Sequence, residues 1–358
     1  MKILTIIGAR PQFIKAASIS RAFAKNTSID EILIHTGQHY DENMSEVFFK
    51  EMNIPEPKIN LGISEQSHGA MTANMINGLE PIFMAEKPDL VLVYGDTNST
   101  LAGALTAVKL HIPIAHIEAG LRSFNLQMPE EVNRILTDRI SKYLFCPTTT
   151  AIKNLDKEGF RNHDCDIIFS GDVMQDSAIY YNKIADEKST IISTLGLKKY
   201  ILCTIHREEN TDDLERLRSI IEAINTLNKE WKIVIPIHPR TRKIMEQNAI
   251  KCDAVLIDPV GYFDMISLIK NSELVITDSG GLQKEAFFFK KCCVTLREET
   301  EWVELVEEGF NSLAGYKKED IITSTYKMLN VHPDFNVNLY GNGHASQHIA
   351  LHLLTAFA

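Results

Sequence analysis

The sequence predicts an α/β protein made of two Rossmann-like domains. Short apolar runs rich in β-branched residues recur along the whole chain, and longer amphipathic stretches separate them. The runs are continuous rather than alternating, which is typical of parallel strands covered by helices on both faces. With 358 residues, the chain is also too long for one ordinary core.

In the first half, apolar runs predict the strands and helical periodicity predicts the helices between them. The strands are Lys2–Ile7, Glu31–Thr36, Leu90–Tyr94, Pro113–Ile117 and Tyr143–Pro147. The helices are Phe13–Lys25, Met44–Met52, Gly69–Lys87 and Ser99–Leu110.

The second half repeats this pattern. Its strands are Ile167–Ser170, Tyr200–Thr204, Lys232–Ile237, Ala254–Ile257, Leu274–Thr277 and Cys292–Leu296. Its helices include Asp213–Asn228, Tyr262–Asn271, Gly281–Phe288 and a last one over Ala345–Phe357. A second βαβ series begins near Ser170-Gly171-Asp172, so we expect one domain over residues 1–169 and another over 170–344. A tandem of this kind forms a cleft between the carboxyl ends of its strands.

Composition excludes several classes of protein. The net charge of −10 argues against nucleic-acid binding, which needs a basic surface. The six cysteines have no metal-ligand spacing, and we interpret them as buried thiols of a reducing cytoplasm. Arg10 and Pro11 interrupt the first apolar run, so it is not a signal peptide. No stretch approaches the roughly 20 apolar residues of a membrane helix.

Polar or glycine-containing turns follow nearly every predicted strand. In the first half they are "GARPQFIK", "TGQHYD", "YGDTNST" and "HIEAGLRS", and in the second "TIHREEN", "PIHPRTR", "TDSGGLQKE" and "LREETEW". Each turn alone has an ordinary structural explanation: Asp96 as a helix N-cap, His206 as a hydrogen-bonded structural histidine, Glu118 as a solvated side chain. Convergence of several turns at one end of each sheet instead favours a functional site.

The turn "TDSGGLQKE" suits an anion. Asp278 or Ser279 can cap the following helix, and Gly280 and Gly281 let backbone N–H groups approach a phosphate at the helix N-terminus. A capped helix with flexible glycines is the structural alternative. The turn is not a Walker motif, and "GARPQF" does not match GxGxxG, so no nicotinamide cofactor is indicated.

Carboxylates collect in the first half. Asp96, Glu118 and the pair Glu130-Glu131 would repel a phosphate, so they should face another part of the ligand. In a water-poor cleft, carboxylates are suited to proton transfer. A ligand with one anionic half and one half that needs acid–base chemistry fits a nucleoside-diphosphate sugar.

With these residues assembled, the chain resembles the non-hydrolysing UDP-N-acetylglucosamine 2-epimerase family. The resemblance extends nearly end to end, through "IIGARPQFIK", "TGQH", "VYGDTNST", "HIEAGLRS", "MPEEVNR", "HREEN", "TDSGGLQKEA" and "LREETEW". It implies a glycosyltransferase-B-type fold whose C-terminal helix, residues 345–358, crosses back to the first domain. It also implies a cytoplasmic homodimer without metal or cofactor, acting in synthesis of cell-surface polysaccharide or lipopolysaccharide O-antigen.

The resemblance implies a reaction and roles for residues. Similar enzymes expel UDP while removing the C2 proton, which leaves a 2-acetamidoglycal, and then add UDP back as C2 is protonated from the other face. Stabilising the departing diphosphate is the electrostatic core of such a step. The implied catalytic residues are Asp96, Glu118, Glu130 and His206. The implied substrate-binding residues are Arg10, Lys15, Gln38, His39, Arg122, Arg134, His238, Tyr262, Met265, Ser279, Gly280, Gly281, Glu285, Arg297 and Glu301, with Glu285 near the ribose and Met265 against uracil.

The chain departs from the common N-acetylglucosamine epimerases in three places. Gln12 replaces Glu in the first turn, and Trp302-Val303 replaces Arg-Pro after Glu301. Asp41 and roughly His68 stand where bacterial relatives bind a regulatory UDP-sugar, which argues against activation by substrate. This variant pattern resembles epimerases of UDP-2,3-diacetamido-2,3-dideoxy-glucuronate, and UDP-N-acetylglucosamine is the alternative substrate.

Three rival functions fit the same fold. A hydrolysing epimerase would release UDP and the free sugar, and a glycosyltransferase would need an acceptor. A non-catalytic binder of nucleotide sugars would have no use for three carboxylates at strand ends.

Overall fold

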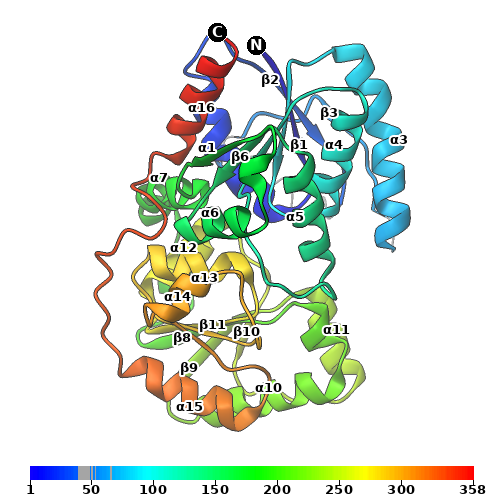
Figure 1. The fold of residues 1–358 in the computed structure, drawn as a ribbon. Helices are drawn as coiled ribbons and strands as arrows, with labels where there is room; N and C mark the ends of the chain where they lie inside the picture. Colours follow the sequence, from blue (N-terminus) through cyan, green and yellow to red (C-terminus); the bar gives the residue numbers. More distant parts are fainter. Residues whose placement is uncertain (39–48, 50, 53, 65–66) are drawn as a thin grey trace. The chain divides into compact units, whose positions relative to one another are not determined.

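The computed structural model describes residues 1–38, 49, 51–52, 54–64 and 67–358, which form two compact units (Figure 1). Unit 1 comprises Met1–Ile179 with Asn338–Ala358, and unit 2 comprises Tyr180–Val337. The predicted helix over 44–52 lies mostly outside the described residues, as do His39 and Asp41. No helix among the described residues is long and apolar enough to cross a membrane.

Unit 1 is built on a seven-stranded sheet with the order β3-β2-β1-β4-β5-β6-β7, and every neighbouring pair in it is parallel. Its strands are β1 (Lys2–Ile7), β2 (Asp30–His35), β3 (Ile59–Asn60), β4 (Leu90–Tyr94), β5 (Ile114–Ile117), β6 (Tyr143–Cys146) and β7 (Asp166–Phe169). The central strand β4 is buried over its whole length, as a strand covered on both faces must be.

Helices connect the strands of unit 1. They are α1 (Arg10–Phe23), α3 (His68–Glu86), α4 (Asn98–Lys109), α5 (Pro129–Ile140), α6 (Thr149–Lys157), the short 3₁₀ turn η1 (Phe160–Asn162) and the start of α7 (Val173–Lys188). One apolar core packs β1, β2 and β4 against α3 and α4, with Leu4, Ile34, Phe83 and Val93 among its fully or nearly fully buried members.

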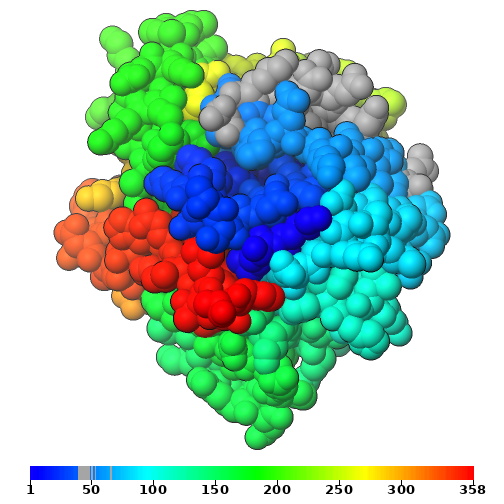
Figure 2. Space-filling model, turned by 90° about the horizontal axis from the view of Figure 1, so that it is seen from above, coloured from blue at the N-terminus to red at the C-terminus, as the bar shows by residue number. Residues whose placement is uncertain are grey.

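The C-terminal helix α16 (Ala345–Ala356) belongs to unit 1 and packs against α1. Figure 2 shows its surface beside that of the N-terminal segment. The buried carboxylate of Asp176 on α7 accepts hydrogen bonds from the backbone N–H groups of Ala345 and Ser346 at 3.1 and 2.7 Å. This carboxylate satisfies donors of the first turn of α16 and so anchors the helix.

Unit 2 repeats the plan with a six-stranded parallel sheet in the order β10-β9-β8-β11-β12-β13. Its strands are β8 (Tyr200–Thr204), β9 (Lys232–Pro236), β10 (Val255–Ile257), β11 (Leu274–Thr277), β12 (Cys293–Thr295) and β13 (Asn311–Leu313). Its helices, after the end of α7, are α8 (Ile191–Thr194), α9 (Glu208–Thr211), α10 (Leu214–Leu227), α11 (Pro239–Gln247), α12 (Tyr262–Asn271), α13 (Gly280–Phe288), α14 (Val303–Glu307) and α15 (Lys318–Leu329).

Most predicted strands have the observed bounds to within one residue, and Lys2–Ile7, Leu90–Tyr94, Tyr200–Thr204 and Leu274–Thr277 match in full. The sequence missed β3 and β13, which are short edge strands. The break between units falls inside α7, after Ile179, whereas the sequence suggested the turn at Ser170–Asp172.

Candidate active site

In each sheet, predicted site residues follow the two strands between which the strand order reverses. In unit 1 the strand order reverses between β1 and β4, and in unit 2 it reverses between β8 and β11. Open parallel sheets bind ligands beyond the carboxyl ends of strands at such a switch point. Arg10 and Asp96 follow β1 and β4, and His206 and Ser279 follow β8 and β11. The topology therefore brings these predicted residues together within each unit.

Glu118 directly follows β5 and has a left-handed backbone, with φ of 73°. For a non-glycine residue this conformation costs about 1–2 kcal/mol, and such strain concentrates at functional sites. The Glu118 carboxylate pairs with the amino group of Lys15 on α1. Both side chains are more than nine-tenths buried, so the pair is poorly screened by solvent.

Asp96 lies in the turn after β4 and pairs with the guanidinium of Arg134 on α5. The same guanidinium donates to the fully buried carboxylate of Glu131 at 2.6 Å. Glu131 also accepts the backbone N–H groups of Ser123 and Phe124, each at 2.9 Å. Glu131 is therefore occupied in holding the 123–124 turn.

Glu130, the preceding residue, is half-buried and makes no ion pair or hydrogen bond with another described residue. Of the two adjacent carboxylates at the start of α5, it is the one left available for chemistry. The residues alone left Glu130 and Glu131 open, and the family resemblance implied Glu130, which stays a prediction.

The turns after β1 and β4 are joined by the buried side chain of Gln12. Its oxygen accepts from the backbone N–H groups of Gly8 and Ala9 at 2.8 and 3.0 Å. Its amide nitrogen donates to the carbonyl of Tyr94 at 3.0 Å, and also to the hydroxyls of Thr97 and Thr100. The half-buried Arg10 thus stands on a turn that is tied to the turn bearing Asp96.

Gln38, which lies in the turn after β2, is hydrogen-bonded to the start of α4. Its oxygen accepts from the hydroxyl and the backbone N–H of Ser99 at 2.9 and 3.2 Å. Ser99 lies in the first turn of α4, which follows Asp96.

Arg122 lies inside the fold and is nearly fully buried. It makes a bidentate ion pair with Glu158 at 2.7 and 2.8 Å, and it donates to Asp138 at 2.7 Å and to the carbonyl of Leu121 at 2.6 Å. Asp138 also contacts the ring of His116. The resemblance implied that Arg122 contacts substrate, whereas these bonds direct its guanidinium to other protein groups.

In unit 2, Asp278 organises the turn after β8. Its fully buried carboxylate accepts the backbone N–H groups of His206 and Arg207, both at 3.0 Å, and the amide of Asn210 at 3.3 Å. Its other oxygen lies 3.1 Å from Nδ1 of His206. Burial raises the pKa of Asp278, but the charge and hydrogen bonds of His206 and the N–H of Arg207 outweigh it, so the net shift is downward. Asp278 stays ionised and orients the half-exposed His206 ring.

Helix α13 begins at Gly280, and Ser279 is its N-cap, with a hydroxyl that accepts from Leu282 N at 3.4 Å. Of the two caps that the sequence allowed, the structure uses Ser279, which leaves Asp278 free to hold the 206–207 turn. A Cβ on Gly280 would collide with Oε1 of Glu301. Only glycine therefore admits the close approach of Glu301 to this helix end.

The segment after β12 is held next to α13. Arg297 and Glu301 form a buried ion pair at 3.0 Å, and the amino group of Lys284 lies 4.0 Å from the ring of Trp302. Trp302 thus covers a buried lysine on α13.

The remaining predicted residues of unit 2 differ in accessibility. His238 is exposed at the N-cap of α11, where its Nδ1 accepts from Arg240 N at 3.3 Å. Glu285 on α13 and Tyr262 on α12 are both buried, with exposed fractions of 5% and 1%. Met265 packs in the core of unit 2 beside Leu282 and Ala286, so its side chain faces apolar neighbours.

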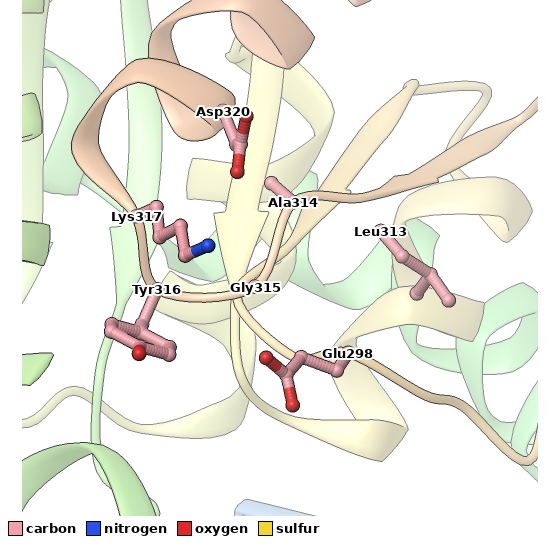
Figure 3. Close-up of a pocket in the computed structure, with 7 residues that line it drawn as sticks. All are labelled: Glu298, Leu313, Ala314, Gly315, Tyr316, Lys317 and Asp320. Atoms are coloured by element: carbon pink, nitrogen blue, oxygen red, sulfur yellow. The ribbon is translucent and has the colours of Figure 1, made fainter.

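A cavity of about 240 Å³ also lies in unit 2, beyond the carboxyl ends of β12 and β13. Figure 3 shows Glu298, Lys317 and Asp320 pointing toward one another across it. None of the predicted site residues lines this cavity. Among the residues described by the structure, no three His, Cys, Asp or Glu side chains form a group that could hold a metal ion.

Sequence analysis missed the residues that support the site. His116, Asp138 and Glu158 hold the 120–122 segment, and Gln12 holds the turns after β1 and β4. Asp278, named only as a possible helix cap, holds the 206–207 turn. The available signal was polarity in otherwise apolar positions, as in His116, which sits inside the strand "IAHI". A polar residue there must find a partner in the interior.

Two units of this topology, each with polar groups at its switch point, define a Rossmann-like α/β protein of the glycosyltransferase-B type. The profile of the UDP-N-acetylglucosamine 2-epimerase family matches residues 21–354, and the chain belongs to that family.

Relatives support this assignment along the full length. The chain is 54% identical over 354 residues to UDP-2,3-diacetamido-2,3-dideoxy-D-glucuronate 2-epimerase of Pseudomonas aeruginosa, with 99% of each chain covered. It is 44% identical over 361 residues to UDP-N-acetylglucosamine 2-epimerase of Methanocaldococcus jannaschii, with 98% of each covered. A crystal structure of that archaeal enzyme in complex with UDP-GlcNAc and UDP superposes with a TM-score of 0.93 over 99% of this chain and 100% of the other.

Proposed function

We propose that the protein is an isomerase, a non-hydrolysing 2-epimerase that inverts C2 of a UDP-2-acetamido sugar. We propose UDP-2,3-diacetamido-2,3-dideoxy-D-glucuronate as the sugar, with UDP-N-acetylglucosamine as the alternative. The relative named for the diacetamido uronate is 54% identical, and the archaeal relative named for N-acetylglucosamine is 44% identical. The product would serve synthesis of a cell-surface polysaccharide such as a lipopolysaccharide O-antigen.

In this proposal, unit 2 binds UDP. The capped N-terminus of α13, with Ser279, Gly280 and Gly281, suits the diphosphate, because N–H groups and the helix dipole favour an anion there. His206, oriented by Asp278, supplies a further donor that acts on the leaving oxygen. Tyr262, Glu285 and His238 remain as contacts to the nucleoside.

Unit 1 carries out the proton chemistry, with Asp96, Glu118 and Glu130 as the acids and bases. One carboxylate takes the C2 proton, the C1–O bond breaks, and UDP leaves with the electron pair to give the 2-acetamidoglycal. In the second half, a carboxyl group protonates C2 from the opposite face and a diphosphate oxygen bonds to C1. Atoms and charge balance, and no oxidant or metal is required.

The observation that carries this proposal is the Glu118–Lys15 pair. A strained left-handed glutamate at a strand exit, buried against a lysine, is costly for folding, and such strain concentrates at functional sites. For Arg122 and Met265 we propose structural roles in place of the substrate contacts that the resemblance implied. We assign Arg122 to support of the β5 turn and Met265 to the core of unit 2, because both side chains face protein groups.

The test is incubation of each UDP-sugar with the protein in deuterated water, followed by NMR of the products. We expect the C2 epimer of the diacetamido uronate with deuterium at C2 and intact UDP. Glu118→Gln should lower the rate at least about 100-fold, because a positioned acid–base group contributes about that much. Glu215→Gln, an exposed substitution on α10, should keep full activity.

Other outcomes separate the rivals. Free UDP and a free reducing sugar would indicate hydrolysis, and turnover only with an added acceptor would indicate a glycosyltransferase. Binding of a UDP-sugar without exchange of its C2 proton for deuterium would indicate a non-catalytic binding protein. Full activity of Glu118→Gln would remove Glu118 from the chemistry.

We further propose that the active form is a homodimer in the cytoplasm, as the family resemblance implies. Sedimentation of the purified protein would test the dimer, and cell fractionation would test the location. All six cysteines are free thiols in the structure, which suits a reducing compartment.

A further inference from the structure

The ring of His116 is enclosed between two acceptors. This residue of β5 is fully buried. Its Nδ1 lies 2.7 Å from Oδ1 of Asp138, and its Nε2 lies 2.7 Å from the carbonyl oxygen of Gly95. A carbonyl oxygen can only accept, so Nε2 must carry a hydrogen.

The second ring nitrogen must also carry a hydrogen. A bare Nδ1 at 2.7 Å from a carboxylate would place two lone pairs against each other. The proton could reside on Asp138 instead, but the other oxygen of that carboxylate already accepts from Arg122 at 2.7 Å and from Gly120 N at 3.1 Å. These two donors, one of them a guanidinium, stabilise the carboxylate form of Asp138, which leaves the second proton on Nδ1 of His116.

Charge balance argues against a pair that lacks the second proton. Arg122 and the partly exposed Glu158 complete the group, so a neutral ring beside an ionised Asp138 would leave one uncompensated negative charge at a fully buried carboxylate.

The bond to Gly95 connects this group to the candidate active site. Gly95 precedes Asp96 and has a left-handed backbone, with φ of 62°. A Cβ on Gly95 would lie 3.0 Å from Nζ of Lys15 and 3.1 Å from Oε2 of Glu118. The peptide that accepts from His116 therefore lies directly beneath the Lys15–Glu118 pair and beside Asp96.

We propose that His116 is a positioning residue, held as an imidazolium between Asp138 and the Gly95 carbonyl. From there it fixes the turn on which Asp96 and the Lys15–Glu118 pair depend. It touches no substrate and acts through the Gly95–Asp96 turn. The kinetic part of this inference rests on the proposed epimerase function, and the protonation state does not.

The protonation state is tested by NMR of protein labelled with ¹⁵N-histidine. The His116 ring is assigned by its loss in His116→Gln and independently by its shift in Asp138→Asn. We expect both ring nitrogens to have N–H character at neutral pH, with an attached proton that exchanges slowly. A ring with one bare, pyridine-type nitrogen would overturn the inference, and the two independent variants keep the assignment available if one of them folds poorly.

The positioning role is tested by steady-state kinetics. His116→Gln should lower kcat about 10–100-fold, as expected when reacting groups are displaced by a fraction of an ångström to an ångström, with KM changed less than about threefold because uniform substrate binding is untouched. Asp138→Asn should have a similar effect, and the double variant should be no worse than either single one, since both remove one coupled unit. His332→Gln, an exposed histidine of unit 2, is the matched control.

The outcomes separate the two proposals. Wild-type kcat in a folded His116→Gln, or additive losses in the double variant, would refute the positioning role. No epimerisation by the wild type with either sugar would refute the proposed function and leave the imidazolium result standing.

Discussion

Replacement of Asp278 by asparagine should destabilise unit 2 by about 3 kcal/mol. The carboxylate accepts from three protein donors, His206 N, Arg207 N and Asn210 Nδ2. Bonds to a charged acceptor are roughly twice as strong as neutral ones, so loss of the charge costs about 1 kcal/mol at each donor. The side chain of His206 is 47% exposed, so solvent screens its ion pair with Asp278. The value of about 3 kcal/mol therefore includes no contribution from that pair.

Tryptophan fluorescence during urea unfolding measures this loss. The chain has only two tryptophans, Trp231 and Trp302, and both belong to unit 2. At an m value of about 2–3 kcal/mol per M, the midpoint should fall by about 1–1.5 M. Asp258→Asn is the control, because the Asp258 side chain is 91% exposed beside Arg242, and its midpoint should not move measurably.

The direction of the Asp278 pKa shift determines how its contribution to stability changes with pH. The pKa of Asp278 is lower in the folded protein than in the unfolded chain, where it is about 3.9. Its stabilisation is therefore complete above the unfolded value and is lost as pH falls through the folded value. The midpoint difference between wild type and Asp278→Asn should be constant from pH 7 to about 5 and shrink below about pH 4. A difference that grows on acidification, or a midpoint equal to the control's, would refute this account of the turn.

Three substitutions in unit 1 test its turns by thermal unfolding followed with circular dichroism. Gln12→Glu should cost about 2–3 kcal/mol, since a carboxylate would face the Tyr94 carbonyl that the amide now donates to at 3.0 Å; unchanged stability would contradict this. Gly120→Ala should cost about 2 kcal/mol or more, because φ is 80° and a Cβ would lie 2.6 Å from a backbone oxygen. Gly69→Ala is the control, and because its Cβ would meet nothing within 4 Å, it should be neutral or slightly stabilising. Glu118→Gly should be about 1 kcal/mol more stable than Glu118→Ala, the reverse of the usual order, because of the left-handed φ; the usual order would mean that no strain is stored.

The sheets were predictable because burial on both faces makes each central strand a continuous apolar run. Helix α5 was not predicted, and the reason is physical. Its buried positions are Glu131, Asn133, Arg134, Thr137 and Asp138. This polar face bonds the turns of the site instead of packing in an apolar core. The helical spacing of apolar residues by which a helix is recognised in a sequence is therefore absent here.

The site was predictable as a set of strand exits, and the partners of each side chain were not. Arg122 was expected on substrate, but its partners Asp138 and Glu158 lie 16 and 36 residues further along the chain. A sequence shows that an arginine follows a strand, and it does not show which distant carboxylates meet it. Met265 is a second example, since helix periodicity shows only that its position is apolar and does not show that it packs beside Leu282 and Ala286.

The ion pairs of unit 1 explain how a chain with a net charge of −10 places two carboxylates, the buried Glu118 and the partly exposed Asp96, at the ends of adjacent strands. Glu118 and Asp96 each meet a cation from a different helix, Lys15 of α1 and Arg134 of α5. Removal of one partner from a buried pair costs about 3–5 kcal/mol, and both members of the Lys15–Glu118 pair are buried, so Glu118 holds α1 in place. Asp96 is 31% exposed, so solvent screens part of its pair with Arg134 and its hold on α5 is weaker. The carboxylates to which we assign proton transfer thereby also fix the helices that carry Lys15 and Arg134.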